Sequence, residues 1–109
     1  MGRFIVLANP KEGRTAEYHT WYQEVHIPEV LACGPFTAAQ RYTLADAQMV
    51  PDQPHAHVAI YEFEGSAQDA IKALGAAAPG FDMTEGGAPG GRMIFVEEAG
   101  PRVEAKKKA

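Results

Sequence analysis

The stretch R-F-I-V-L-A, residues 3–8, decides the fold because it has the length of a strand and is apolar on both faces. Neighbouring side chains of a strand point to opposite faces of the sheet, so Phe4 and Val6 face one way while Ile5 and Leu7 face the other. The segment 92–98, R-M-I-F-V-E-E, has the same pattern. We therefore expect a sheet that must be covered on both sides.

A helix is predicted directly after the first strand, over residues 15–26. Thr15 is the expected N-cap, and the aromatic side chains recur at helical spacing. Pro28 has no N–H for the carbonyl of Glu24 and disfavours the α conformation at Ile27, so we expect a kink or a break there. Proline also suits the first turn of a new helix, and this second piece should run to residue 32 or 33.

The remaining pattern predicts strands at 37–44, 55–64 and 92–98, and a helix at 67–78 capped by Ser66. The order β-α-β-β-α-β indicates an α+β, ferredoxin-like fold with a four-stranded antiparallel sheet and both helices on one face. The other face would then be bare and apolar, which favours a homodimer that packs sheet on sheet. We expect one domain at residues 1–100 and a charged C-terminal tail at 101–109.

Composition excludes several classes of protein. The chain has 109 residues, a formal charge of −4, one cysteine and a pI near 5.5. The acidic balance disfavours nucleic-acid binding, so the terminal lysines 106–108 are interpreted as a solvated end. No apolar run is long enough for a membrane helix, nothing resembles a signal peptide, and the single cysteine fits a cytoplasmic protein.

No cofactor is expected. The glycine-rich segment 79–91 lacks the Lys-Ser/Thr of a phosphate loop and precedes a strand, and no dinucleotide fingerprint occurs. We expect this segment to be a lid or a loose edge. His55 and His57 form an H-x-H pair, but spacing fixes no third ligand, so no metal is predicted. Cys33 has no cationic neighbour in sequence and is assigned a packing role.

His26 is the main candidate for chemistry. It continues a stripe formed by Tyr18 and Tyr22 at intervals of four residues, and it lies where Pro28 interrupts the helix. An imidazole at such a position suits general acid–base catalysis near neutral pH. The alternative is a surface histidine that caps a helix end.

Two further candidates lie on the strands. His57 and Tyr61 share one face of their strand; they approach His26 if that face meets the helices, and they are interface groups if it meets a partner subunit. Arg41 lies mid-strand and either holds an anionic substrate or forms an ion pair with Glu62 or Glu64.

The segment W-Y-Q-E-V-H-I-P-E-V-L, residues 21–31, resembles the dimeric α/β-barrel superfamily, in particular EthD-like proteins. Phe36 with Q-R-Y at 40–42, and A-I-Y-E-F-E at 59–64 before a helix, are similar to the same family. The resemblance implies a ferredoxin-like homodimer with a pocket between the sheet and the helices of each subunit. The superfamily includes methylmuconolactone isomerases, polyketide cyclases and cofactor-free monooxygenases, and its H-x-P histidine, here His26, lines the pocket.

These observations lead to one functional hypothesis and two alternatives. The hypothesis is a cofactor-independent isomerase, cyclase or lyase that acts on an aromatic, polyketide or lactone-like molecule. The expected catalytic residues are His26, Tyr22, His57, Tyr61 and Arg41, with substrate contacts from Tyr18, Trp21 and Phe36. The alternatives are a cofactor-free monooxygenase and a non-catalytic, EthD-like ligand-binding or accessory protein.

Overall fold

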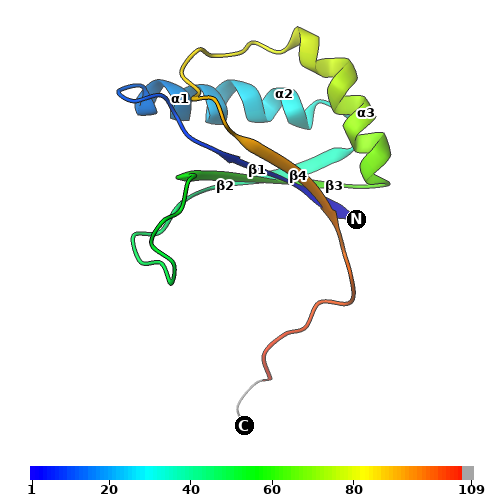
Figure 1. Ribbon diagram of the computed structural model, residues 1–109. Helices are drawn as coiled ribbons and strands as arrows, with labels where there is room; N and C mark the ends of the chain where they lie inside the picture. Colours follow the sequence, from blue (N-terminus) through cyan, green and yellow to red (C-terminus); the bar gives the residue numbers. More distant parts are fainter. Residues whose placement is uncertain (107–109) are drawn as a thin grey trace.

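The computed structural model describes residues 1–106, and it contains one sheet covered by helices on one side (Figure 1). In chain order, the elements are β1 (Gly2–Ala8), α1 (Thr15–Trp21), η1 (Tyr22–His26), α2 (Ile27–Leu31), β2 (Phe36–Thr43), β3 (His57–Phe63), α3 (Ala67–Ala77), η2 (Ala78–Gly80) and β4 (Arg92–Glu97).

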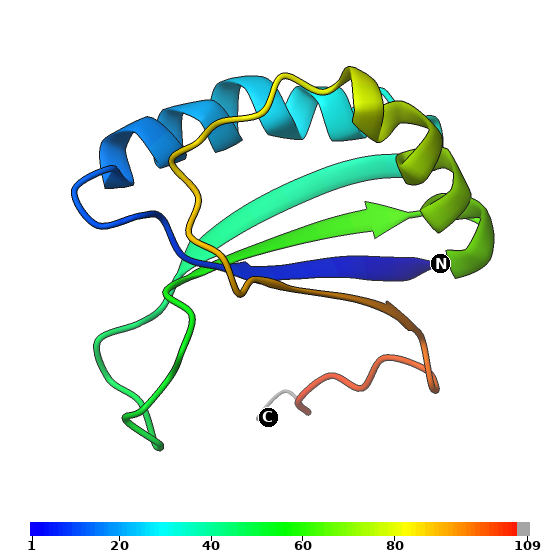
Figure 2. The same cartoon turned by 45° about the horizontal axis from the view of Figure 1, so that its top comes forward.

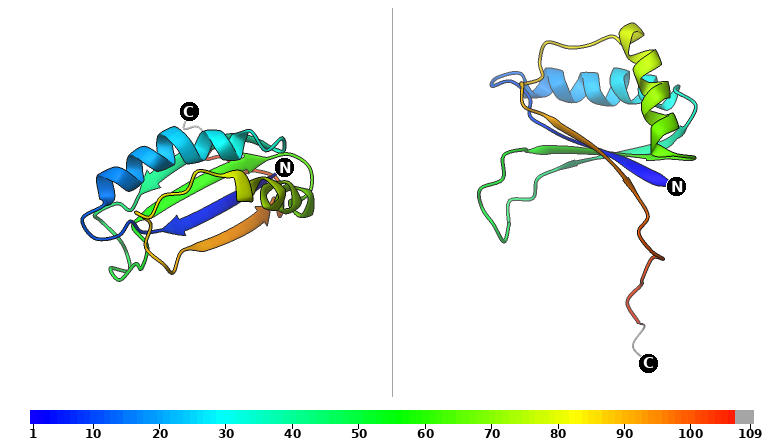
Figure 3. Two further views of the ribbon diagram at one scale, coloured as in Figure 1. Left: turned by 90° about the horizontal axis from the view of Figure 1, so that it is seen from above. Right: turned by 45° about the vertical axis from the view of Figure 1, so that its right-hand side comes forward.

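The four strands lie in the order β2-β3-β1-β4, and every neighbouring pair is antiparallel. The continuous helical run α1–η1–α2 and the separate helix α3 lie on the same face (Figure 3). This is the predicted α+β, ferredoxin-like arrangement. The strand ends differ from the prediction by one or two residues, and His55 falls just before β3 rather than in it.

The sheet has a closed face and an open face. Phe4 pairs with Tyr61 on β3 and with Phe95 on β4, and these side chains point toward the helices. Phe4 is 4% exposed and Tyr61 is fully buried. On the open face Ile94 is 47% exposed and Tyr42 is 50% exposed. The strands are apolar on both faces, but within this chain the helices cover only one of them.

The helix does not break at Pro28, one of the two outcomes predicted there; the chain instead forms an irregular helical turn just before the proline. The run from Thr15 to Leu31 is continuous because the turn Tyr22–His26 is a π-helix, in which the Ile27 N–H donates to the Tyr22 carbonyl five residues back. Ile27 keeps α-helical dihedrals, with φ −58° and ψ −49°. The wider turn lets the chain pass the proline, which has no N–H to donate, without leaving helical geometry.

One predicted cap is wrong and one is confirmed. Thr15 is the first residue of α1 rather than its cap; the N-cap is Arg14, whose side chain bonds Glu17 at 2.7 Å. Ser66 caps α3 as predicted, and its Oγ accepts a hydrogen bond of 3.1 Å from the Asp69 N–H.

Two segments project from the sheet on the side away from the helices: the β2–β3 loop, residues 44–56, and the C-terminal segment from residue 98 (Figure 1). The predicted tail, residues 101–109, is described only as far as Lys106, and Lys107, Lys108 and Ala109 lie outside the described residues. Within residues 1–106, no helix is long and apolar enough to cross a membrane.

Candidate functional site

A cavity of about 640 Å³ lies between the sheet, the α1–η1–α2 helix and the segment that leads from α3 to β4. Figure 2 shows this segment, residues 81–91, arching from the end of α3 across the helix before it turns into β4. The sheet contributes Phe4, Val6 and Met93 to the cavity wall. The lining is mostly apolar, so a ligand that fills the cavity must itself be largely apolar.

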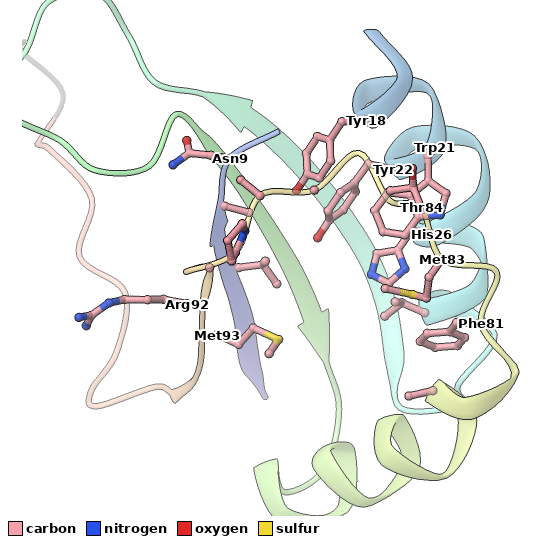
Figure 4. A pocket seen from close by; sticks show the side chains of 18 of the residues that line it. Asn9, Tyr18, Trp21, Tyr22, His26, Phe81, Met83, Thr84, Arg92 and Met93 are labelled. Carbon is pink, nitrogen blue, oxygen red and sulfur yellow. The ribbon is translucent and has the colours of Figure 1, made fainter. Parts of the chain in front are cut away.

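His26 projects from η1 into this cavity (Figure 4). Its imidazole stacks on Trp21, with ring centroids 4.5 Å apart and planes inclined by 21°. Tyr22 and Phe81 meet the imidazole edge-on, at centroid distances of 5.0 and 5.6 Å. Its Nδ1 atom is buried and has no hydrogen-bond partner among residues 1–106.

The surroundings of His26 favour the neutral imidazole. Burial lowers its pKa below the ordinary value of 6.5, and the carboxylate of Glu29 opposes this effect in part. A neutral imidazole has one nitrogen with a free lone pair, so at neutral pH this side chain is ready to accept a proton.

Tyr22 also lines the cavity, and it belongs to a buried pair of phenols. The Tyr61 hydroxyl donates to the Tyr22 oxygen at 3.2 Å. Burial raises the pKa of Tyr22 to about 12, and burial together with Tyr22 raises the pKa of Tyr61 further. Both phenols are therefore protonated at neutral pH, and Tyr22 keeps its own hydrogen free for another acceptor.

The Arg41 and His57 side chains lie behind the two cavity tyrosines and do not line the cavity. The Arg41 guanidinium is 4.8 Å from the centre of the Tyr22 ring, and its Nη1 is 2.9 Å from Nδ1 of His19. Among residues 1–106 it forms no ion pair with Glu62 or Glu64, the alternative considered from sequence. Arg41 therefore contacts the cavity wall only indirectly, through the Tyr22 ring.

His57 lies on the closed face of the sheet with Tyr61. Of the two alternatives from sequence, the structure therefore shows the one in which this face meets the helices. The His57 ring contacts Tyr18 edge-on at 5.8 Å, and no contact joins it to His26. Its Nδ1 is buried without a partner among the described residues. Burial lowers its pKa, and the charges of Arg41 and His19 lower it further.

The predicted substrate contacts divide into two groups. Tyr18 and Trp21 line the cavity (Figure 4). Phe36 does not line it; the side chain is 3% exposed and packs in the core against Phe4, Tyr61 and Phe63.

The segment 81–91 supplies cavity residues that were not singled out from sequence, namely Phe81, Met83 and Thr84. It is held in place rather than loose. The Lys11 N–H donates to the Gly86 carbonyl at 2.7 Å, and the Ala88 N–H donates to the Asn9 carbonyl at 2.8 Å. The signal in the sequence was the pair of apolar residues in an otherwise glycine-rich stretch, since exposed linkers rarely need them.

The other reactive side chains have plain surroundings. Cys33 is half-buried, and burial raises its pKa, so it is a thiol that packs, as its sequence context predicted. Glu29 is engaged: its two carboxylate oxygens accept from the Asp82 N–H, each at 3.1 Å. Within residues 1–106, no three histidine, cysteine or carboxylate side chains gather in a way that would hold a metal ion.

Comparison with known proteins relates the fold to solved structures. No family model and no curated protein matches the sequence. A protein from Arabidopsis thaliana, At3g17210, superposes with a TM-score of 0.71 at 16% identity, covering 94% of this chain and 100% of that one. An EthD family protein from Bacillus halodurans superposes with a TM-score of 0.60 at 9% identity, over 90% of this chain and 99% of that one.

The chain shares the fold of an EthD family protein. A Nitrosomonas europaea protein thought to be an antibiotic biosynthesis monooxygenase has the same fold, with a TM-score of 0.58, 12% identity, and coverage of 91% of this chain and 99% of that one. The EthD-like fold expected from the H-x-P segment is therefore confirmed. Identities this low describe the fold and leave the reaction to the residues of the site.

Proposed function

We propose that the chain is a cofactor-independent enzyme that moves a proton on a small, largely apolar carbonyl compound. The observation that carries the proposal is the neutral, unpaired imidazole of His26 in an apolar cavity large enough for an aromatic or lactone-like molecule. The expected reactions are isomerisation, cyclisation or elimination, because each begins with loss of a proton from a carbon beside a carbonyl.

In this mechanism, His26 is the general base and Tyr22 is the electrophile. The imidazole takes the proton from the carbon, and the electron pair of that C–H bond moves onto the carbonyl oxygen. The Tyr22 phenol donates a hydrogen bond to the oxygen as it becomes negative. The imidazolium then returns the proton at another carbon or to a leaving group, which restores the neutral base.

Tyr61 and Arg41 support Tyr22 in this scheme. Because Tyr61 donates to the Tyr22 oxygen, the Tyr22 hydrogen is directed away from Tyr61. The Arg41 cation over the Tyr22 ring favours negative charge on that phenol and strengthens it as a donor. His57 stands farther back and keeps Tyr18 in place through ring contact.

A cofactor-free monooxygenase is the second candidate. The likeness in fold to a protein thought to be an antibiotic biosynthesis monooxygenase supports it. The first step would be the same proton removal, after which the substrate anion itself reduces oxygen. Oxygen uptake with a quinol-like substrate separates this candidate from the first.

We also propose that the enzyme is a homodimer that packs the open faces of two sheets together. The open face presents Ile5, Leu7, Ile60, Ile94 and Val96 in adjacent register on three strands. Such a continuous apolar surface is costly in water, and a second copy offers an equally apolar, self-complementary cover.

The proposed function is tested by proton exchange, which requires no knowledge of the final product. An aryl β-keto lactone in deuterated buffer is followed by NMR for loss of its acidic proton. We expect His26→Gln to slow the catalysed exchange by about 10²–10⁴-fold, the usual contribution of one general base. His55→Gln is the matched control, since His55 does not line the cavity.

The pH profile gives a second criterion. Because the pKa of His26 lies below 6.5, the rate should be constant above pH 7 and fall on the acid side. A fully active, folded His26→Gln protein would contradict the catalytic proposal. Ligand binding without exchange would favour the accessory role.

A further inference from the structure

The backbone of Asp82 joins the segment 81–91 to the helix that carries His26. Its carbonyl accepts a hydrogen bond of 2.6 Å from the Trp21 indole N–H. Its N–H donates to both carboxylate oxygens of Glu29 at 3.1 Å. The two backbone polar groups of one residue, Asp82, are thus both bonded to side chains of the helix.

Two residues joined to Asp82, Trp21 by a hydrogen bond and Phe81 as its chain neighbour, enclose the imidazole. Trp21 covers one face of the His26 ring, and Phe81, the residue before Asp82, meets the ring edge-on. The imidazole makes no hydrogen bond through its buried Nδ1 within residues 1–106, so ring packing fixes its orientation in place of a hydrogen-bonded partner. Catalytic histidines are usually oriented by a carboxylate that bonds one ring nitrogen, and within residues 1–106 no carboxylate bonds His26 Nδ1.

We propose that Glu29 is the positioning residue of the site: its carboxylate anchors the Asp82 N–H, and the Asp82 backbone in turn holds Trp21 and Phe81 against the His26 ring. The inference goes beyond the proposed function and rests on it only for its effect on turnover. Glu29 does not line the cavity, and its role is geometric and electrostatic.

The charge of Glu29 has a separate effect on the imidazole. Glu29 is the carboxylate that stabilises the protonated form of His26 and partly offsets burial. Tyr22, with a pKa of about 12, is neutral throughout the range in which His26 titrates. The sheet, α3 and η2 present Phe4, Val6, Met93, Leu74 and Ala78 to the cavity, and the cavity residue Arg92 is exposed. Glu29 is therefore the acidic group with which the titration of His26 is coupled.

Trp21 is the one tryptophan of the chain, so its fluorescence reports directly on this junction. An imidazolium stacked on an indole quenches its emission, which makes the emission a measure of His26 protonation. The NMR resonance of the His26 Cε1–H gives the same titration independently. Both signals, together with amide exchange at Asp82, are measured without any substrate.

The experiment compares Glu29→Ala and Glu29→Gln with the wild-type protein. Glu29→Ala removes both the anchor and the charge, whereas Glu29→Gln keeps one acceptor oxygen and removes only the charge. Glu24→Ala is the matched control, because Glu24 is an exposed carboxylate of the same helix.

For Glu29→Ala we expect a red-shifted Trp21 emission and at least about tenfold faster exchange of the Asp82 amide. We expect kcat for proton exchange to fall about tenfold while KM changes less, as a misplaced catalytic group requires. For Glu29→Gln we expect the emission maximum to stay and the titration midpoint of His26 to move down. Glu24→Ala should match the wild type.

The failure of this inference is distinguishable from the failure of the proposed function. Unchanged emission and Asp82 exchange in folded Glu29→Ala would overturn the positioning role, whatever the activity. If Glu29→Ala does not fold, Glu29→Asp takes its place, because its shorter side chain withdraws the carboxylate from the Asp82 N–H; unchanged emission and Asp82 exchange in that variant overturn the positioning role. If instead His26→Gln retains full activity while the Glu29 variants show the expected emission, Asp82 exchange and His26 titration, the catalytic proposal falls and the anchoring role stands.

Discussion

The two faces of the sheet are built from the same strands and are almost equally apolar, but they differ in what accompanies the apolar groups. On the closed face, fully buried Tyr61 bonds Tyr22 and an unpaired His57 lies nearby. On the open face, isoleucine and valine dominate, and Tyr42 is half-exposed. Polar groups gain reactivity when they are withdrawn from water, so the closed face suits chemistry and the open face suits association.

The largest effect is expected on the open face. Ile94→Asp places a carboxylate opposite Ile5, in the middle of the proposed dimer interface. Burying an unpaired carboxylate costs several kcal/mol, so the dimer dissociation constant should rise by at least about 10³-fold. Because Ile94 is 47% exposed in the subunit, the fold itself should tolerate the change.

Sedimentation velocity of Ile94→Asp beside Lys72→Asp measures this effect, since Lys72 is exposed on α3. A wild-type protein that stays monomeric at about 100 µM, far above the Kd of a stable interface, would remove the basis of the comparison.

The next effect tests how tightly the closed face is packed. A Cβ on Gly2 would lie about 2.5 Å from the Val96 carbonyl oxygen and would overlap the Phe63 ring. Gly2→Ala should therefore destabilise the protein by about 1–3 kcal/mol, measured by urea unfolding.

Gly75→Ala is the opposite case, because nothing lies within 4 Å of its added Cβ in α3. It should stabilise by about 0.5–1 kcal/mol through helix propensity. A Gly2→Ala protein at least as stable as the wild type would show that packing around β1 is looser than the contacts at Gly2 indicate.

The sequence predicted the fold because the fold depends on patterns that are local. Strand alternation, the Ser66 cap and the order of elements each follow from a few neighbouring residues. The sequence could not decide between a kink and a break at Pro28, because the outcome depends on a hydrogen-bond shift from four to five residues, which costs little and leaves no mark in the sequence.

The site was only partly predictable for a different reason. His26, Tyr22 and Trp21 share one helix, so their proximity follows from spacing. Phe36 and Arg41 lie on β2, and whether they reach the cavity depends on how far the helix covers that strand. Phe81 and the Asp82 backbone are brought in by long-range hydrogen bonds that no local pattern contains.

A smaller effect is expected from the phenol pair. Tyr61→Phe removes the donor to Tyr22 and should cost about 1 kcal/mol of stability, the usual net value of one hydrogen bond. It should also lower kcat for proton exchange without a matching change in KM, since Tyr22 loses its orientation. Tyr42→Phe on the open face is the control. Equal effects of the two substitutions would show that the closed face gives its tyrosine no special role.

The smallest effect is a slope in stability with pH, and it also separates the two faces. His26 and His57 both have pKa values lowered by burial, so the unfolded chain binds their protons more readily than the folded one. The contribution of the two histidines to the free energy of unfolding should be complete above pH 6.5 and decline as pH falls toward the folded pKa values.

Urea midpoints between pH 8 and pH 5, at one fixed protein concentration, measure the slope above the range where carboxylates titrate. His57→Gln should flatten the slope, because burial makes the imidazole of His57 resist protonation. An unaltered slope in both His57→Gln and His26→Gln would mean that these rings reach water, and the closed face would then lose the property that sets it apart.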